Sequence, residues 1–325
     1  MAVSNLAPNP PSRPRRLLAI ATALITSAAA LTAALPAHAA ISCDTDTTGG
    51  STFYDGPSAS KKYDARFSNS VSIPNLSTQT PQGAGTWYNW DGSGKNLLLV
   101  ASYRDGADSQ IYGIDPSTGS TVGVVAIAES HVGGITVSKG WAFVSGQGSS
   151  IRKYRLTELR DALKAAGTPY LAQVGTARDV AASSFIGSYG DSLFSGSFND
   201  TGRGTMYEYK IADDGTLTTV AGAWEVPTKT QGLTVTATHF IYSTSYGRGN
   251  RSNLYVVKRG QKDLDAAALS CFRAPSMTEG ITEYNGTAYL VYESGSYLYA
   301  SDPTTLNVIP RLHKASISSL TSLVP

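Results

Sequence analysis

The 325-residue sequence has little of what marks the common enzyme and binding classes. Charged residues make up only 15% of the chain and the formal net charge is +2, so there is no basic footprint for nucleic acid and no strong field for an acidic partner. GxSxG, HExxH and a Gly-rich phosphate loop before a helix are all absent, which excludes the usual motifs of serine hydrolases, zinc proteases and nucleotide-binding enzymes.

Long hydrophobic runs are also scarce. The one candidate, Leu17–Leu35, follows a short basic segment and precedes "PAHA", which puts Ala37 and Ala39 at the small-residue positions of a signal-peptidase site. We therefore predict a removed signal peptide over 1–39 and an extracellular domain over 40–325. A membrane anchor is the alternative reading of this run. "RRLL" leaves Sec and Tat export both open.

Cysteine is limited to Cys43 and Cys271, both in the exported part. A single pair in an oxidising compartment predicts one disulfide. The two lack CxxC spacing and a neighbouring histidine, so we expect no metal site there.

The chain does contain an internal repeat. Phrases such as "GGITVSKGWAFVSG", "TQGLTVTATHFIYST" and "TEGITEYNGTAYLVYES" recur, and their aligned positions are Thr86, Ile135, Ser184, Leu233 and Ile281. The intervals are 49, 49, 49 and 48 residues. Each unit predicts four short antiparallel strands, which is typical of a β-propeller blade. A helix is predicted in "LTELRDALKAAGTPY" with Thr157 as its N-cap, and a weaker one in "KDLDAAALS".

The number of blades depends on the two ends. Five first strands are visible, and His313–Ile317 matches His131–Ile135 in spacing, which suggests a sixth. We favour an all-β propeller of six blades, with five as the alternative. One blade would be closed by strands from both termini, which removes exposed sheet edges.

The repeat also predicts which residues share a face. In a propeller the fourth-to-first connections and the second-to-third loops emerge together around the central funnel. The residues that the repeat places there as ligand-binding candidates are Arg104, Asp105, Asp179, Lys229, Gln231, Tyr246 and Arg248. The catalytic candidates in the same register are Glu279, Glu293, His131 and His313.

Glu293 differs from its apparent counterparts. The residue that closes the second strand is serine in the other units, namely Ser102, Ser145, Ser195 and Ser243. We interpret those serines as structural, each bonding a backbone group in the turn. A glutamate there indicates a specific role in a site, or else a solvated carboxylate at a loop edge. A carboxylate and an imidazole could act as base and acid, or two histidines and a carboxylate could hold a metal, but no local motif favours a metal and no cofactor is indicated.

One segment resembles a known family. "TQGL…IYSTSYGRGNRSNLY" from Thr230 resembles a blade of the propeller-type glutaminyl cyclases, which run Thr-Gln-Gly-Leu, Tyr-Glu-Ser-Thr and Tyr-Gly-Arg-Ser. The resemblance implies a propeller fold and covers about 26 of the 325 residues. The family's catalytic glutamate would fall at Ser243, and "YES" at Glu293 supplies a similar phrase two residues later in its repeat.

Two functions follow. The first is a secreted protein whose funnel face binds an extracellular ligand, which we expect to be a glycan or a cell-surface polymer, because Tyr-rich polar faces suit such ligands. The second is a secreted hydrolase, lyase or cyclase that uses Glu293, Glu279 and a histidine. We expect a monomer that binds neither nucleic acid nor, after signal cleavage, a membrane.

Overall fold

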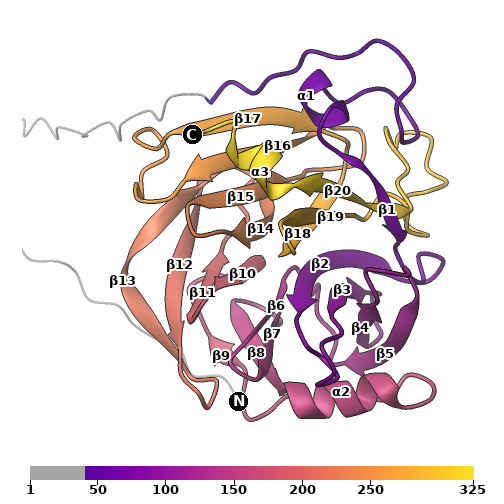
Figure 1. The fold of residues 1–325 in the computed structure, drawn as a ribbon, viewed down its shortest axis with the longest axis vertical. Coiled ribbons are helices and arrows are strands. Elements are labelled where there is room, and N and C mark those ends of the chain that lie inside the picture. The colour runs from indigo at the N-terminus through magenta and orange to yellow at the C-terminus, as the bar shows by residue number, and fades with distance from the viewer. Residues whose placement is uncertain (1–40) are drawn as a thin grey trace, which may run out of the picture. The chain divides into compact units, whose positions relative to one another are not determined.

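The computed structural model describes residues 41–325, which form five four-stranded antiparallel sheets arranged as propeller blades (Figure 1). The predicted signal peptide lies outside the described residues. Between residues 41 and 325, none of the helices has the length and apolar character needed to cross a bilayer.

Each blade runs from an inner strand near the centre to an outer strand. Blade 1 contains β2 (Thr80–Trp87), β3 (Leu97–Tyr103), β4 (Ser109–Ile114) and β5 (Thr121–Ile127). Blade 2 contains β6 (Ile135–Ser138), β7 (Trp141–Ser145), β8 (Ser150–Arg155) and β9 (Arg178–Asp179). Blade 3 contains β10 (Phe185–Tyr189), β11 (Ser192–Gly196), β12 (Gly204–Ile211) and β13 (Leu217–Val226).

The remaining two blades follow the same plan. Blade 4 contains β14 (Thr230–Val235), β15 (His239–Thr244), β16 (Ser252–Lys258) and β17 (Leu269–Ala274). Blade 5 contains β18 (Thr278–Tyr284), β19 (Thr287–Tyr292), β20 (Arg311–Ser316) and, as its outer strand, β1 (Ser68–Ser72). The inner strands contact one another in the cyclic order β2, β6, β10, β14, β18 and back to β2, so they form a closed ring.

The prediction of six blades is wrong for the described residues, which form five sheets. His313 lies in β20, the third strand of blade 5, and not in a sixth inner strand. The leftover N-terminal segment supplies β1, which pairs with β20 through Ser68 opposite Lys314 and Asn69 opposite His313. The two ends of the described chain therefore complete one blade together and do not form a separate one.

Close backbone contacts narrow the centre of the ring. A Cβ atom on Gly280 of β18 would lie 2.4 Å from the backbone nitrogen of Ala84 on β2. One on Gly134 would lie 2.4 Å from the backbone nitrogen of Ile186 on β10. Only glycine allows inner strands to approach this closely. Gln82 of β2 lines a cavity at one end of the channel and Ala84 lines a cavity at the other, so the constriction divides the channel in two.

In the described part of the chain, three short helices lie outside the sheets. The predicted helix is α2 (Leu156–Lys164), and its buried Leu159 and Leu163 pack in the core of blades 1 and 2. It begins after Arg155 with no side-chain cap, so the predicted N-cap at Thr157 is wrong. The others are α1 (Lys61–Asp64), capped by the Ser60 hydroxyl, and α3 (Ile317–Thr321).

The weaker helix predicted from Lys262 is not formed. Its residues make turns, because the backbone N–H of Leu264 donates to the Glu225 carboxylate at 3.0 Å and the Leu264 side chain is buried against blades 3 and 4. These tertiary contacts outweigh the weak helix propensity of the segment.

The predicted disulfide between Cys43 and Cys271 is confirmed. It fixes the N-terminal segment beside β17, where the backbone N–H of Asp44 donates to the Cys271 carbonyl at 2.9 Å.

Candidate functional site

Three inner strands carry a β-bulge where they enter the ring. The strand register shifts between Pro81 and Gly83 in β2, between Thr230 and Gly232 in β14, and between Thr278 and Ile281 in β18. Bulges re-aim side chains and are common beside active sites. The residues within these shifts are Gln82, Gln231 and Glu279, each followed by glycine. Three blades thus present one amide or carboxyl each at equivalent backbone positions.

Glu293 is the second carboxyl group of this region. It follows the last residue of β19, and its backbone N–H donates to the Met277 carbonyl at 3.2 Å. In blade 4 the N–H of Ser245 donates to the Lys229 carbonyl at 2.9 Å in the same way. The structural counterpart of Glu293 is therefore Ser245 and not Ser243.

The strand-closing serines have mixed roles. The hydroxyl of Ser243 donates to the Glu279 carbonyl, and that of Ser195 donates to the Ala182 carbonyl, so the structural interpretation holds for these two. The hydroxyls of Ser102 and Ser145 are buried and have no hydrogen-bond partner among residues 41–325. The prediction that each serine bonds a backbone group is therefore wrong for these two. Ser243 of blade 4 holds the backbone of Glu279 in blade 5.

Burial raises the pKa of both carboxyl groups. Glu279 is 1% exposed, and burial, followed by the negative charge of Glu293, raises its pKa well above the usual range. For Glu293, burial raises the pKa to about 7, against the opposing effects of a 2.8 Å hydrogen bond from the Gln82 amide and the charge of Arg248. The two groups titrate as a pair. Near neutral pH the pair therefore retains a proton, which Glu279 holds more tightly than a solvated carboxyl does.

Glu279 is also incompletely satisfied. Its Oε1 atom is buried and, within residues 41–325, has no hydrogen-bond partner. A buried polar atom without a partner costs roughly 1–3 kcal/mol of stability. Such a cost is typical of a group kept for binding or chemistry rather than for folding.

Two tyrosines and an arginine stand beside the pair. Tyr103 and Tyr299 interact through their side chains, and the pKa of each is raised by burial and by the Glu293 charge. The guanidinium of Arg248 lies 5.1 Å from the Tyr299 ring centre and forms an ion pair with Asp302. Both Tyr299 and Asp302 come from the long connection between β19 and β20, which has no equivalent in the other blades.

The pair lies next to an open funnel of about 820 Å³. Gln82, which bonds Glu293, lines this cavity together with Tyr103, so both are shared between the pair and the funnel. Four of the residues predicted from the repeat also line it, namely Arg104, Asp105, His131 and Gln231. His131 is exposed, and its ring centre lies 4.4 Å from that of Tyr103.

Other predicted residues lie elsewhere. Lys229 and Tyr246 line a smaller pocket of about 350 Å³, with the ammonium of Lys229 4.7 Å from the Tyr246 ring centre. Asp179 is on the outer strand β9 and lines a separate pocket of about 420 Å³. Arg248 contributes its charge to the carboxyl pair as described above.

His313 lies inside the core and not in the funnel. Its Nδ1 is 2.6 Å from the Tyr63 hydroxyl, and its ring packs against Tyr54 and Tyr292. Burial lowers its pKa to about 3, so it is neutral at physiological pH. The sequence interpretation placed it beside His131 because the spacing matched, but β20 is a third strand and its residues do not reach the channel. We leave His313 out of the site.

Sequence reasoning missed Gln82, Tyr299 and Asp302. Gln82 had a usable signal, because Thr80-Pro-Gln-Gly is a variant of Thr230-Gln-Gly and Thr278-Glu-Gly with one residue inserted. Tyr299 and Asp302 belong to a connection outside the repeat, so no periodic signal could mark them.

Backbone strain occurs just before three of the inner strands, and one of the strained residues, Val132, lines the funnel. Val132, Lys229 and Met277 have positive φ angles of 43°, 65° and 60°, and each lies just before an inner strand. For a β-branched residue such as Val132 this conformation is an outlier, and outliers of this kind cluster at functional sites. Within residues 41–325, no three His, Cys, Asp or Glu side chains lie close enough together to hold a metal ion.

Comparison with known proteins supports the fold. No family model and no curated protein matches the sequence. The chain is similar in structure to Myxococcus xanthus glutaminyl cyclase, with a TM-score of 0.50, 10% identity, and coverage of 76% of this chain and 94% of that one. The resemblance to the propeller-type glutaminyl cyclases is thus confirmed at the level of the fold.

Two further likenesses are weaker. BBS1N, solved in complex with ARL6DN, has a TM-score of 0.36 at 12% identity, and the alignment covers 76% of this chain and 65% of that one. BamB from Moraxella catarrhalis has a TM-score of 0.31 at 12% identity, with coverage of 68% and 55%. The chain spans about two thirds of the first and about half of the second.

Proposed function

We propose that this protein is a secreted enzyme that performs acid–base chemistry with Glu293 and Glu279 on a polar ligand bound in the funnel. The observation that carries the proposal is the carboxyl pair itself. Two glutamates are desolvated side by side, Glu279 has no ion pair among residues 41–325, and the pKa of Glu293 is raised to about 7. A general base or acid is most effective when its pKa lies near the working pH.

The roles of the two carboxyls follow from their surroundings. Glu293 is partly exposed, borders the funnel through Gln82 and takes a proton from the substrate. Glu279 is fully buried, stays protonated longer and supplies the proton that the leaving group needs. Pairs of titratable groups whose environments push their pKa values apart commonly divide acid and base roles in this way.

The reaction to test first is cyclisation of an N-terminal glutaminyl residue. The α-amino nitrogen attacks the side-chain amide carbon, a ring C–N bond forms, and the bond to the amide nitrogen breaks. One proton leaves the attacking amine for Glu293, and one reaches the departing ammonia from Glu279. The reaction needs no water, metal or redox partner. It is chosen because the similar structure is named a glutaminyl cyclase and because the pair provides both proton transfers.

The open funnel favours a substrate larger than a single residue. A cavity of about 820 Å³ is within the usual range for ligand sites and exceeds what one amino-acid side chain fills. Arg104, Asp105, His131 and Gln231 would then hold the rest of a peptide or, as the second candidate, the end of a glycan or cell-surface polymer. In the latter case the same pair would serve a hydrolase or lyase, or Glu293 would simply bind a hydroxyl.

Secretion is part of the proposal. The Cys43–Cys271 bond suits an oxidising compartment, and the N-terminal run with its small-residue site suits export. We expect the mature domain to act outside the cell as a monomer, away from nucleic acid and membranes.

The test is incubation of the mature domain with a peptide that begins with glutamine, followed by mass spectrometry for loss of ammonia. Glu293→Gln and Glu279→Gln should each remove the activity. Glu283→Gln is the matched control, because Glu283 lies on the same strand as Glu279 but faces the other end of the channel.

If the wild-type domain leaves this peptide unchanged, the cyclase assignment is wrong. The broader acid–base proposal is then tested by product release from a panel of extracellular polysaccharides and cell-wall polymers. If the wild type and Glu293→Gln both bind a polymer and neither releases a product, the protein is a binding protein and not an enzyme.

A further inference from the structure

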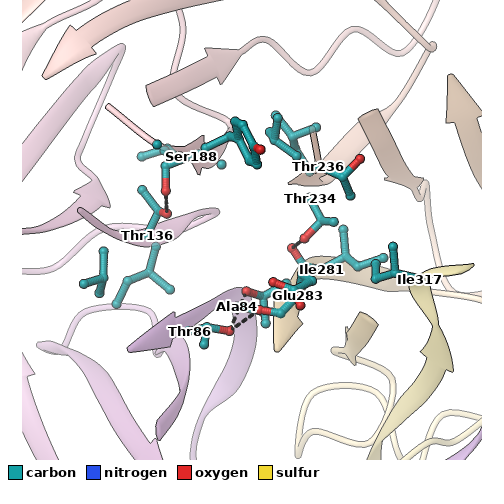
Figure 2. Close-up of a pocket in the computed structure, with 18 of the residues that line it drawn as sticks. Ala84, Thr86, Thr136, Ser188, Thr234, Thr236, Ile281, Glu283 and Ile317 are labelled. Atoms are coloured by element: carbon teal, nitrogen blue, oxygen red, sulfur yellow. Dashed lines mark hydrogen bonds between the residues drawn. The ribbon is translucent and has the colours of Figure 1, made fainter. Parts of the chain in front are cut away.

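The channel has a second cavity, at the end away from the carboxyl pair. It has a volume of about 460 Å³ and lies where the inner strands finish. Among the described residues the two cavities have no lining residue in common, and along β2 and β14 they are lined by successive parts of the same strand. Figure 2 shows side chains from several blades surrounding this space.

Each of the five inner strands contributes one serine or threonine hydroxyl group to the lining. They are Thr86 of β2, Thr136 of β6, Ser188 of β10, Thr234 of β14 and Thr282 of β18. The hydroxyl oxygens of Thr86 and Thr282 lie 3.0 Å apart. Those of Thr136 and Ser188, which Figure 2 shows, lie 2.5 Å apart. A hydroxyl has one donor and two acceptor positions, so these pairs retain capacity for further bonds.

The floor of this cavity is apolar. Buried side chains from each blade close it toward the constriction, namely Ala84, Ile135, Ile186, Leu233 and Ile281. An apolar floor under a hydroxyl-lined wall suits a ligand that carries both C–H surface and many hydroxyl groups.

Two tyrosines at the mouth are exposed although they are large and partly apolar. Tyr88 is 47% exposed and Tyr189 is 46% exposed, and both line the cavity. The Tyr88 hydroxyl accepts from the backbone N–H of Asn285 at 3.1 Å, and the Arg259 guanidinium lies 5.4 Å from the Tyr189 ring centre. These contacts hold both rings in place as flat surfaces beside the opening.

The charge of the lining excludes anionic ligands. Among the described residues the only charged side chain in the wall is Glu283, which accepts from the backbone N–H of Gly286 at 2.6 Å. Within residues 41–325, no lysine or arginine lines the cavity to neutralise a phosphate or carboxylate.

We propose that this second cavity is a binding site for a short neutral saccharide, held by stacking on Tyr88 and Tyr189 and by hydrogen bonds to the ring of hydroxyls. Aromatic rings beside polar edges provide the contact that sugars use, since a pyranose presents C–H groups on its faces and hydroxyls around its rim. The site is separate from the carboxyl pair and does not depend on the proposed reaction.

The experiment is saturation-transfer NMR and calorimetry on the mature domain with cellotetraose and with triacetylchitotriose. We expect at least one to bind, with transfer to the ring C–H protons. Tyr189→Ala should weaken that binding about tenfold or more, because it removes a stacking surface. Thr136→Val, which keeps the shape and removes a hydroxyl, should weaken it by a smaller factor.

Tyr246→Ala is the matched control, since Tyr246 is 50% exposed and lines a pocket at the funnel end of blade 4. It should leave the affinity unchanged. The proposal is overturned if neither probe binds at millimolar concentration, because the second cavity would then hold water and no saccharide. It is also overturned if binding is lost in Tyr246→Ala and kept in Tyr189→Ala, which would place the sugar at the funnel. Circular dichroism of each variant confirms that the domain is folded.

Discussion

Blades 4 and 5 have nearly the same inner strand and very different chemistry. Both enter the ring through a bulge after a threonine, and both place the following residue at the channel. In blade 4 that residue is Gln231 and the residue after the second strand is Ser245, whereas blade 5 has Glu279 and Glu293. Two substitutions on an unchanged backbone convert neutral groups into a coupled pair of acids. The repeated backbone therefore determines where the side chains lie at the channel. The identity of single residues determines which blade carries groups that can transfer protons.

The largest expected effect is on turnover. Glu293→Gln places an uncharged side chain after the second strand of blade 5, where blade 4 has Ser245, and keeps the shape of the glutamate side chain. On the proposed mechanism it should reduce the rate by about 10²- to 10⁴-fold, the usual contribution of a general base. The measurement is initial rate on the glutaminyl peptide, with the melting temperature as a folding check. A rate within a factor of three of wild type would remove Glu293 from the mechanism.

The next effect concerns how the outer edges of the two blades are held. Blade 5 is closed by β1, while the N-terminal segment beside the outer strand of blade 4 is fixed by the disulfide. Replacing both Cys43 and Cys271 with serine should lower the free energy of unfolding by about 2–4 kcal/mol. Urea titration of the mature domain measures this. A change below about 0.5 kcal/mol, close to the error of such measurements, would mean that backbone pairing alone fixes the segment.

The third effect is a change of stability with pH. Because the pKa of Glu279 is raised on folding, the native state holds its proton more tightly than the unfolded chain does. Below the ordinary value of 4.5 the group is protonated in both states and makes no pH-dependent contribution to stability. As pH rises toward and beyond 7, where Glu293 also titrates, wild type should lose stability relative to Glu279→Gln.

Thermal melts of wild type and Glu279→Gln between about pH 4 and 9 test this prediction. This range is roughly the one over which these groups titrate. Glu279→Gln should melt higher than wild type at alkaline pH and converge with it at acid pH. Glu283→Gln is the matched control on the same strand and should show no such divergence. A wild-type advantage that grows with pH would contradict the assigned direction of the pKa shift.

The smallest effect distinguishes the two glutamines. Gln82 donates to Glu293 and holds its pKa down, whereas Gln231, the equivalent residue in blade 4, makes no such bond among residues 41–325. Gln82→Leu should therefore raise the pKa of Glu293 above about 7 and move the acidic limb of the activity profile to higher pH. NMR titration of labelled glutamate carboxyl carbons detects the shift without relying on activity. Gln231→Leu should leave the titration unchanged, and equal shifts in both variants would show that the bond is not the cause.

Much of the fold could be predicted from the sequence, since a regular period of 48–49 residues and paired strand phrases are local features. The blade count was wrong because assigning β1 and β20 to one sheet requires knowing which distant strands pair. In the candidate site, Glu279 and Glu293 were identifiable as departures from Gln and Ser in the repeat. Gln82 was missed because Pro81 adds one residue to the Thr-Gln-Gly motif of β2. Tyr299 was missed because it lies in a connection that no other blade has. His313 shared only a spacing with His131, and spacing alone does not say which strand of a blade a residue occupies.

The pairing of β1 with β20 also fixes the order in which the domain can be assembled. Ser68 must meet Lys314, so the last blade cannot form until almost the whole chain has been synthesised. Contacts of such long sequence separation slow folding, because a large loop must close before any energy is gained. The segment that forms β1 therefore stays unpaired until the segment that forms β20 has been made. The ring closes as a final step, and only then does Glu279 lie against the inner strand of blade 1.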